Sequence, residues 1–174
     1  MKCMLSLLAL TFLVSCGPMV RVDFDESQDF SEFTTYKFYP DIDSGLNQLD
    51  DKRVMHAIDS VLQQKGFKKD NFNRFYVNFY ASERISDSRS SIGIGVGSGG
   101  RNGGVGVSGG IPIGGPRVSQ VLTIDIVDAY KDQELVWQAV VEGQLNERAS
   151  PAKKEAYYYS VISKALKKFP PENK

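Results

Sequence analysis

The sequence is poor in the residues that most often carry chemistry. Its 174 residues include two cysteines, Cys3 and Cys16, and a single histidine, His56. Both cysteines lie near the N-terminus, so the body of the chain has no thiol to join His56 in a metal site or in a cysteine–histidine pair. The body also has no cysteine pair for a disulfide, and packing alone has to stabilise its core.

The chain also lacks an excess of charge of either sign, with 21 Lys and Arg against 21 Asp and Glu. A nucleic-acid-binding domain needs a basic surface, so this balance argues against a nucleic-acid partner. The charges are unevenly spread, because residues 23–51 carry nine acids and only one base, Lys37, whereas residues 153–174 are rich in lysine. This distribution predicts two solvated faces of opposite sign.

No apolar run is long enough to cross a membrane, since a spanning helix needs roughly 20 such residues. The longest run, Leu5–Val14, follows the positive Lys2 and ends before Gly17 and Pro18, as in an export signal. At its end, residues 13–16 (Leu-Val-Ser-Cys) resemble the cleavage and lipid-attachment box of bacterial lipoproteins. We therefore expect residues 1–15 to be a removed signal peptide and Cys16 to become a lipidated N-terminus.

The alternatives are a plain secretory signal with an incidental Cys16, or a short buried helix. Lipidation would place residues 16–19 as a short tether and residues 20–171 as one domain, which is long enough for a core. The expected location is the cell envelope, with membrane lipid as the partner of the anchor. Gly17 after the cysteine is not an aspartate-type retention signal, which favours the outer membrane, facing the periplasm.

Alternation and helical periodicity predict the elements of the domain. Val20–Asp25 and Thr34–Tyr39 alternate as half-buried strands and are expected to pair with each other. A helix is expected from Asp50 or Asp51 to Lys65, with Gly66 as its C-terminal stop and an apolar stripe of Val54, Ile58, Val61 and Leu62. The next strand, residues 75–81, directs Phe75, Val77 and Phe79 to one face and Tyr76, Asn78 and Tyr80 to the other.

Residues 93–115 hold 12 of the 16 glycines. Isoleucines and valines alternate with glycine on both sides of a turn-like centre, which predicts a β-hairpin, with a disordered glycine linker as the alternative. Two formal G-x-G-x-x-G matches occur in this segment. Neither follows an apolar strand or precedes a helix, so no phosphate-binding loop is expected.

The last third of the chain predicts a hairpin followed by a helix. Strands are expected over residues 120–128 and 134–145, with Leu135, Trp137, Ala139 and Val141 on one face. The helix should begin at Ser150 and Pro151 and bury Tyr159, Ile162, Leu166 and Phe169. The element order predicts the α+β class, with an antiparallel sheet, both helices packed on one face and the glycine-rich hairpin in the middle.

No motif predicts a catalytic residue, a cofactor or a metal. His56 points away from the apolar stripe of its helix, and the calcium-like stretch from Asp41 to Gly45 has its glycine one position early and Lys52 at the place of the bidentate glutamate. Tyr76, Tyr80 and Trp137 remain as contact candidates for a ligand or a partner. A single tryptophan is more often a core anchor than a ligand platform.

Several segments together resemble a known family. They are Val22-Asp23-Phe24-Asp25 with Phe30-Ser31 and Thr34–Phe38, the helix ending at Gly66, Phe75–Phe79, Leu122–Asp128, Leu135–Gln138, and Lys168–Pro171. In this order and spacing the chain resembles the bacterial lipoproteins known as domain of unknown function 4136. Members often have an acidic residue just before the middle strand, where this chain has Asn73 and Arg74. The resemblance implies an envelope lipoprotein and brings no activity, cofactor or catalytic residue.

The favoured function is a non-enzymatic binding or structural module of the envelope that binds a protein or another wall or membrane component. The alternative is a carrier or sensor of a small apolar ligand in a groove between sheet and helices, which a pocket lined by Tyr76, Tyr80 or Trp137 would favour. A hydrolase is the third possibility, and a serine triad would have to recruit His56. The sequence predicts no oligomeric state.

Overall fold

The structure is a computed structural model that describes residues 19–86, 91–92, 111–112, 117–146 and 148–172. The predicted signal peptide, Cys16 and most of the glycine-rich segment lie outside these residues. The elements in chain order are β1 (Met19–Phe24), β2 (Thr35–Phe38), α2 (Gln48–Gln64), β3 (Lys68–Lys69), β4 (Phe75–Ser86), β5 (Ser91–Ile92), β6 (Ile111–Pro112), β7 (Arg117–Asp128), β8 (Leu135–Asn146), α3 (Pro151–Ala165) and the short 3₁₀ helix η1 (Leu166–Lys168).

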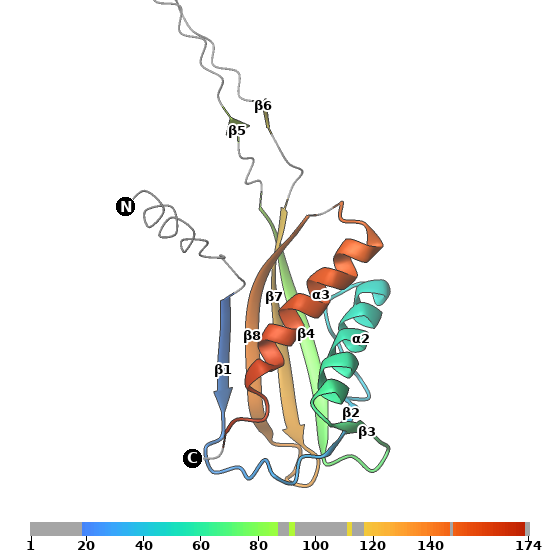
Figure 1. Ribbon diagram of the computed structural model, residues 1–174, viewed down its shortest axis with the longest axis vertical. Helices are drawn as coiled ribbons and strands as arrows, with labels where there is room; N and C mark the ends of the chain where they lie inside the picture. The colour runs from blue at the N-terminus through green and yellow to red at the C-terminus, as the bar shows by residue number, and fades with distance from the viewer. Residues whose placement is uncertain (1–18, 87–90, 93–110, 113–116, 147, 173–174) are drawn as a thin grey trace, which may run out of the picture.

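Six strands form one sheet in the order β1-β8-β7-β4-β2-β3 (Figure 1). The three central strands, β8, β7 and β4, are antiparallel neighbours, and β1 is antiparallel to β8. In contrast, β2 runs parallel to both β4 and β3. The predicted α+β class is confirmed, but the expectation of a purely antiparallel sheet is wrong, because α2 carries the chain back along the sheet between β2 and its partners.

The strands β1 and β2 lie toward opposite edges of the sheet, so the predicted pairing between them is wrong. Val22 of β1 pairs with Ala139 of β8, far along the chain, whereas Tyr36 of β2 pairs with Phe75 of β4. Alternation in a sequence indicates a strand and its buried face but not the strand beside it. The predicted hairpin of β7 and β8 is confirmed, with Ile124 opposite Ala139.

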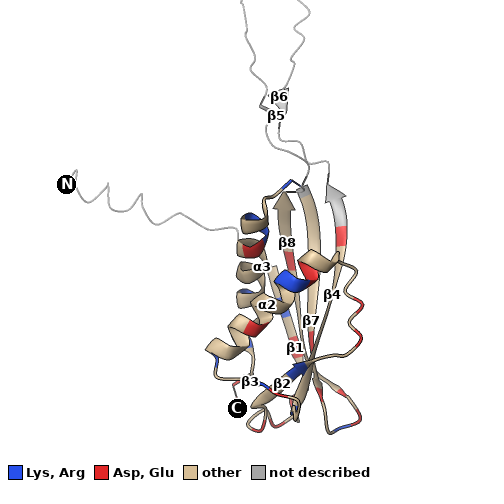
Figure 2. Cartoon of the chain, turned by 90° about the vertical axis from the view of Figure 1, so that its right-hand side faces the viewer, with Lys and Arg blue, Asp and Glu red and all other residues tan. Residues whose placement is uncertain are grey.

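Both helices cover the same face of the sheet, as Figures 1 and 2 show. The core between them is aromatic, and its largest fully buried side chains include Trp137, Tyr36, Tyr158, Phe75, Phe79 and Phe169. The ring of Phe169 lies at the centre of this group, with centroid distances of 5.1 Å to Trp137, 5.4 Å to Phe67 and 5.6 Å to Phe75. This packing stabilises a core that has no cysteine.

The helices α2 and α3 run in the same direction. Near their N-terminal ends, Lys154 Nζ of α3 donates to Asp50 Oδ2 of α2 at 2.7 Å. Beyond their C-terminal ends, Lys65 Nζ donates to the carbonyl oxygen of Lys167 at 3.3 Å. The N-cap of α2 is Asn47, whose side chain accepts from the amides of Leu49 and Asp50, so the prediction of Asp50 or Asp51 as the cap is wrong. The Asp50 side chain instead forms the ion pair with Lys154 that links α2 to α3.

The C-terminal stop of α2 agrees with the sequence, since Gly66 has a φ of +94°. The start of α3 at Ser150 and Pro151 also agrees. The predicted buried stripe of α3 is partly wrong, because Tyr158 is fully buried and Tyr159 is 43% exposed. Tyr158 shares a face with Val161, Ile162 and Ala165, all of which are buried. Tertiary packing of α3 on the sheet therefore determines which of the two adjacent tyrosines is buried.

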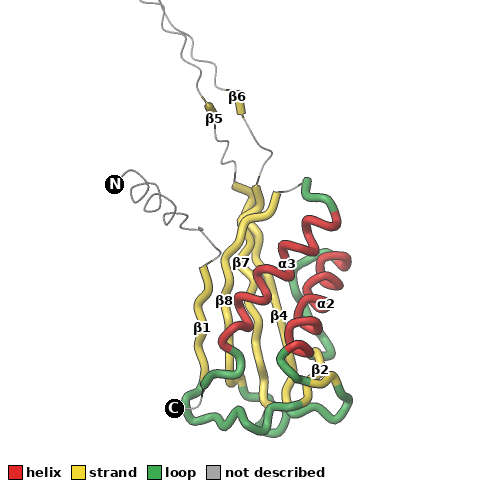
Figure 3. Tube along the Cα trace, in the orientation of Figure 1, coloured by secondary structure: helices red, strands yellow, loops and turns green. Residues whose placement is uncertain are grey.

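Connecting loops gather at one end of the sheet, where the β1–β2, β3–β4 and β7–β8 connections lie near one another (Figure 3). Arg74 at the start of β4 and Asp128 at the end of β7 form an ion pair there. β5, just before the glycine-rich segment, pairs antiparallel with β6 inside it, with Ile92 opposite Ile111. The rest of the predicted hairpin, residues 93–110 and 113–115, lies outside the described residues, so the hairpin stays a prediction.

Candidate functional site

The sheet has a second face that no helix covers among the described residues (Figure 2). We call it the helix-free face. It is formed by side chains of β1, β8, β7, β4 and β2 that alternate with the core residues: Arg21, Asp23, Lys37, Tyr39, Tyr76, Asn78, Tyr80, Ser82, Val121, Thr123, Asp125, Val127, Leu135, Gln138, Val140 and Glu142. The strand register arranges many of them into rows across the sheet.

The first row runs from Lys37 of β2 through Tyr76 and Val127 to Leu135. Tyr39, just after β2, adds a second aromatic ring beside Tyr76. The rings of Tyr39 and Tyr76 meet edge to face with centroids 5.5 Å apart. The Tyr39 hydroxyl contacts Gln133 Oε1 at 2.5 Å. This part of the face therefore exposes two tyrosine rings and the Leu135 side chain, and the contact with Gln133 holds Tyr39 against the β7–β8 turn.

Leu135 belongs to this row because of an irregularity in β8. The β7–β8 register shifts between Ile126 and Val127, so that Trp137 pairs with Ile126 and Leu135 pairs with Val127. Val136 is the extra residue, and it is 1% exposed. The prediction that Leu135 shares the core face of Trp137 is therefore wrong, because a β-bulge sends Leu135 to the opposite face, where it is 49% exposed.

The second row is polar and crosses four strands, from Asp23 through Gln138 and Asp125 to Asn78. Gln138 Nε2 donates to Asp125 Oδ1 at 2.9 Å. Burial raises the pKa of the Asp125 carboxyl above its usual value, and the hydrogen bond from Gln138 only partly offsets this. The Asp125 carboxylate is thus partly desolvated within this row.

The third row contains Tyr80, Thr123, Val140 and Arg21. Thr123 is only 4% exposed, whereas Tyr80 is 45% exposed at the side of the row. Most charges of the face lie at its margins, where Arg21 Nη2 bonds Glu142 Oε1 at 3.0 Å on the β1 side and Lys37 lies on β2. Aromatic and aliphatic side chains beside a central polar row, with most charges at the rim, are compatible with a protein interface.

The three predicted contact residues do not come together. Tyr76 and Tyr80 both lie on the helix-free face, on β4. Trp137 lies in the core, 1% exposed, with its ring against Phe169. The space between sheet and helices is filled by these aromatic side chains, and a surface depression of about 250 Å³ that includes Trp137 is formed mainly by exposed ends of β1 and β8.

Sequence reasoning missed several members of the helix-free face, among them Tyr39, Val127, Leu135 and Val140. Tyr39, Val127 and Val140 alternate with core positions, so the alternation of their strands carries a signal for them. Leu135 had no such signal, because the bulge at Val136 reverses the phase of β8. Strand order, which brings the four residues onto one surface, is not encoded in local alternation.

Other candidate chemistry is not supported by the structure. His56 is exposed on α2, away from the buried stripe, as the sequence predicts. Within the described part of the chain, no group of three or more His, Cys, Asp and Glu side chains could hold a metal ion. No helix among the described residues is long and apolar enough to cross a membrane.

Comparisons with known proteins give a family and a fold. The family model with the description "Domain of unknown function (DUF4136)" matches residues 20–171. No curated protein sequence matches the chain. Among solved structures, a PDZ domain protein from Parabacteroides distasonis is similar over 90% of this chain and 37% of its own length, with 14% identity and a TM-score of 0.57.

A second solved structure, the PelC dodecamer from Paraburkholderia phytofirmans, is similar over 86% of this chain and 94% of its own, with 15% identity and a TM-score of 0.50. The chain thus spans well under half of the PDZ domain protein and nearly all of PelC. At these identities the likeness shows a shared fold.

Proposed function

Since the chain belongs to the family described as "Domain of unknown function (DUF4136)", which names no activity, we propose a function from the residues themselves. The protein is a lipid-anchored binding module of the cell envelope, held by Cys16, that docks a protein partner on its helix-free face. The observation that carries this proposal is the aromatic patch on that face, where Tyr39 contacts Tyr76 and Leu135 lies in the row of Tyr76, all exposed or partly exposed.

The anchor is supported by residues 2–16, which combine a basic start, a short apolar run and a small residue before Cys16. The structure adds one fact, that β1 begins at Met19. Only Gly17 and Pro18 then separate the proposed lipid from the sheet. Three Cα–Cα steps reach about 10 Å at full extension, so the domain would sit at the membrane surface.

A protein partner is supported by the shape and composition of the helix-free face. Tyrosine provides a large contact area at low entropic cost and keeps a polar hydroxyl for hydrogen bonds. The charges Arg21, Glu142 and Lys37 lie around the margin, so docking would not have to desolvate them at the centre. Asp125 is the exception, and it is already partly buried, which raises its pKa.

The filled core favours this proposal over the carrier of a small apolar ligand. Such a carrier needs an enclosed cavity of several hundred Å³. Trp137, Phe75 and Phe169, which would have to line a groove between sheet and helices, are 0–1% exposed and pack on one another. The exposed position of His56 gives a hydrolase no support either, since the histidine of a serine triad is oriented by a buried carboxylate.

Photo-crosslinking in intact cells tests the docking face. A photoreactive amino acid replaces Tyr80 in one strain and Tyr159 in another. These two tyrosines make a matched pair, since they are 45% and 43% exposed and lie on opposite sides of the molecule. We expect a discrete protein adduct from position 80 and none of that mass from position 159.

Binding by purified proteins completes the test once the captured partner is identified. Tyr80→Ala should weaken its Kd by at least about tenfold, as expected for an exposed aromatic side chain that docking buries. Tyr159→Ala should leave the Kd unchanged. Equal capture from both positions, or a Kd that is insensitive to Tyr80→Ala, would contradict docking on the helix-free face.

A further inference from the structure

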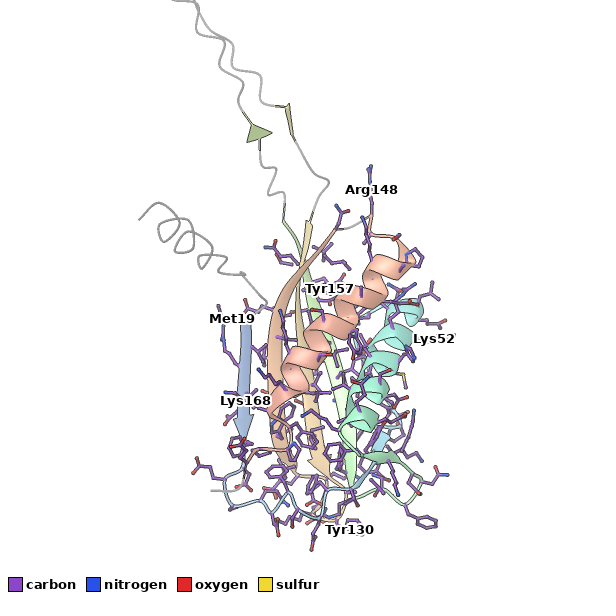
Figure 4. All side chains as sticks on the ribbon, in the orientation of Figure 1. Met19, Lys52, Tyr130, Arg148, Tyr157 and Lys168 are labelled. Carbon is purple, nitrogen blue, oxygen red and sulfur yellow. The ribbon has the colours of Figure 1, made fainter. Side chains whose placement is uncertain are left out.

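A groove lies on the other side of β1, between this edge strand and the end of α3. Its floor is formed by Val20 and Val22, which are partly buried, and its rim by Lys164, Lys167 and Lys168. The groove has a volume of about 310 Å³. It is open because α3 crosses the sheet obliquely and ends at η1, beside β1 (Figures 1 and 4).

The three rim lysines have no acidic partner among the described residues. Arg21, Arg53, Lys69, Arg74 and Lys154 each form an ion pair. Lys164, Lys167 and Lys168 form none, and Lys65 adds a fourth positive charge where its Nζ meets the carbonyl of Lys167. Together the four lysines form a positively charged rim above the apolar floor of Val20 and Val22.

Part of this charge has a structural explanation. Because α2 and α3 are parallel, the negative ends of both helix dipoles lie together, and lysines there stabilise the pair. That accounts for positive charge at these helix ends. It does not account for the valine floor or for its position next to the proposed tether.

The tether limits what this groove can face. Figure 4 shows Met19 at the start of β1 and Lys168 beside the same strand. Met19 is 59% exposed, and it comes three residues after Cys16. If Cys16 carries lipid, the start of β1 is within about 10 Å of the headgroups. A surface of negative phosphates is complementary to the lysine rim.

We propose that the groove between β1 and α3 binds the phosphate headgroups of anionic phospholipids and seats the β1 edge of the domain on the membrane. This proposal rests on the lipid anchor proposed above. Lys164, Lys167 and Lys168 contact phosphates, while Val20 and Val22 face the interfacial region. Seating fixes the orientation of a domain that the anchor alone would leave free to tumble.

The test uses lipidated protein purified from cell membranes and reconstituted into vesicles. One set is phosphatidylcholine alone and the other contains 30% phosphatidylglycerol by design, both with a headgroup spin label as quencher. A fluorophore is attached through Ser160→Cys, an exposed position one turn before Lys164, or through Asn71→Cys near the opposite sheet edge. The mature chain has no other free thiol, because its one native cysteine, Cys16, carries the lipid.

Docking predicts strong quenching at position 160 in phosphatidylglycerol vesicles, weak quenching there in phosphatidylcholine, and weak quenching at position 71 in both. The triple variant Lys164→Gln, Lys167→Gln and Lys168→Gln should lower the docked-to-free ratio by about a hundredfold at low salt, roughly fivefold for each lysine. The matched control Lys52→Gln, Lys68→Gln and Lys153→Gln should not change it. Cooperative urea unfolding verifies that both triple variants are folded.

Equal quenching at position 160 in the two kinds of vesicle would overturn the groove proposal. Unchanged quenching in the Lys164→Gln, Lys167→Gln and Lys168→Gln variant would also overturn it. Neither result would contradict the lipid anchor. The anchor has its own readout, the mass of the N-terminal peptide. An unmodified Cys16 in that peptide would overturn the anchor, and the groove proposal would fall with it.

Discussion

Asp128 is fully buried at the end of β7, at the loop end of the sheet. Burial alone would raise its pKa, but the hydrogen bond and charge of Arg74, together with the amide of Tyr130, lower the pKa below its usual value. The Arg74 guanidinium lies between two rings, 4.8 Å from the centroid of Phe33 and 5.2 Å from that of Tyr130. This ion pair joins β4, β7 and the β7–β8 turn.

Asp128→Asn should destabilise the fold by roughly 3 kcal/mol at pH 7, because it removes the buried partner of Arg74 and leaves only the exposed Glu32, at 3.5 Å. A carboxyl with a lowered folded pKa contributes stability above its unfolded pKa of about 3.9, and this contribution is lost as the pH falls through the folded value. The difference from wild type should therefore shrink below about pH 4. Urea unfolding across pH measures it, with the exposed Asp23→Asn as control. A difference that is constant with pH would contradict the ionised pair.

Position 143 requires glycine because the Tyr157 side chain lies where a Cβ would be. A Cβ at this position would lie 2.5 Å from the Tyr157 hydroxyl oxygen and 3.0 Å from its Cε2 atom. Figure 4 shows Tyr157 on α3, on the side that faces the sheet. The glycine in β8 therefore permits the close approach of helix and sheet.

Gly143→Ala should cost about 1–3 kcal/mol of unfolding free energy, the usual range for overpacking. Adding Tyr157→Phe removes the closest atom and should recover part of that loss. The free energies of the two single variants and the double variant form a cycle that measures the coupling. Additive losses would show that Tyr157 is not the neighbour that excludes a side chain.

At the level of elements, the two helix starts look alike in sequence but differ in structure. Asn47 caps α2 through its side chain, whereas Ser150 at the start of α3 makes no side-chain cap hydrogen bond. Asn47 Nδ2 also donates to Asp50 Oδ2 at 2.7 Å, so it supports the Asp50–Lys154 link between the helices.

Asn47→Ala should therefore lower stability by about 1–2 kcal/mol, while Ser150→Ala should have little effect. The pair serves as its own control, since both changes remove a polar residue from an exposed N-cap. Thermal or urea unfolding of the two variants is the measurement. Losses of equal size would show that the cap geometry does not distinguish the helices.

Local sequence pattern predicts most helices and strands of this fold, but it predicts fewer of the strand pairings and packing contacts between them. Alternation located β1, β4, β7 and β8 and their buried faces, and helical periodicity located the stripe of α2. Pattern could not pair β1 with β8, because strand partners depend on the whole topology. It also misplaced Leu135 and Tyr159, since a β-bulge and the phase of helix packing are tertiary effects.

The candidate site is predicted in part for the same reasons. Tyr76 and Tyr80 lie on the expected face of β4, but Trp137 belongs to the core, and Tyr39 and Leu135 join the surface only through strand order and the bulge. The helix-free face is a property of the assembled sheet. Cys16 is predicted from its local sequence alone and lies outside the described residues.

For the whole molecule, the two proposed surfaces are compatible. The lysine-rimmed groove lies on the helix side of β1, and the helix-free face is on the other side of the same sheet. A domain seated on the membrane through its β1 edge would hold the sheet upright and leave the helix-free face open to a neighbour in the envelope.

Cys16→Ser should abolish lipidation and leave residues 1–15 attached, because a hydroxyl cannot form the thioether. The precursor should be larger than the wild-type mature protein, by both gel mobility and intact mass. Cys3→Ser, which changes the other cysteine within the signal, is the control and should be processed normally. Normal processing and membrane retention of the Cys16→Ser variant would refute the anchor.

The most direct measurement of docking is thiol reactivity in isolated cell envelopes compared with purified protein. Ser82→Cys places a thiol on the exposed end of the helix-free face, and Lys52→Cys places one on the far side of α2. If a partner covers the helix-free face, a soluble maleimide should react with the Ser82→Cys variant at least about tenfold more slowly in envelopes than after purification, and with the Lys52→Cys variant equally fast in both. Equal rates for the Ser82→Cys variant in envelopes and in purified form would contradict docking on this face.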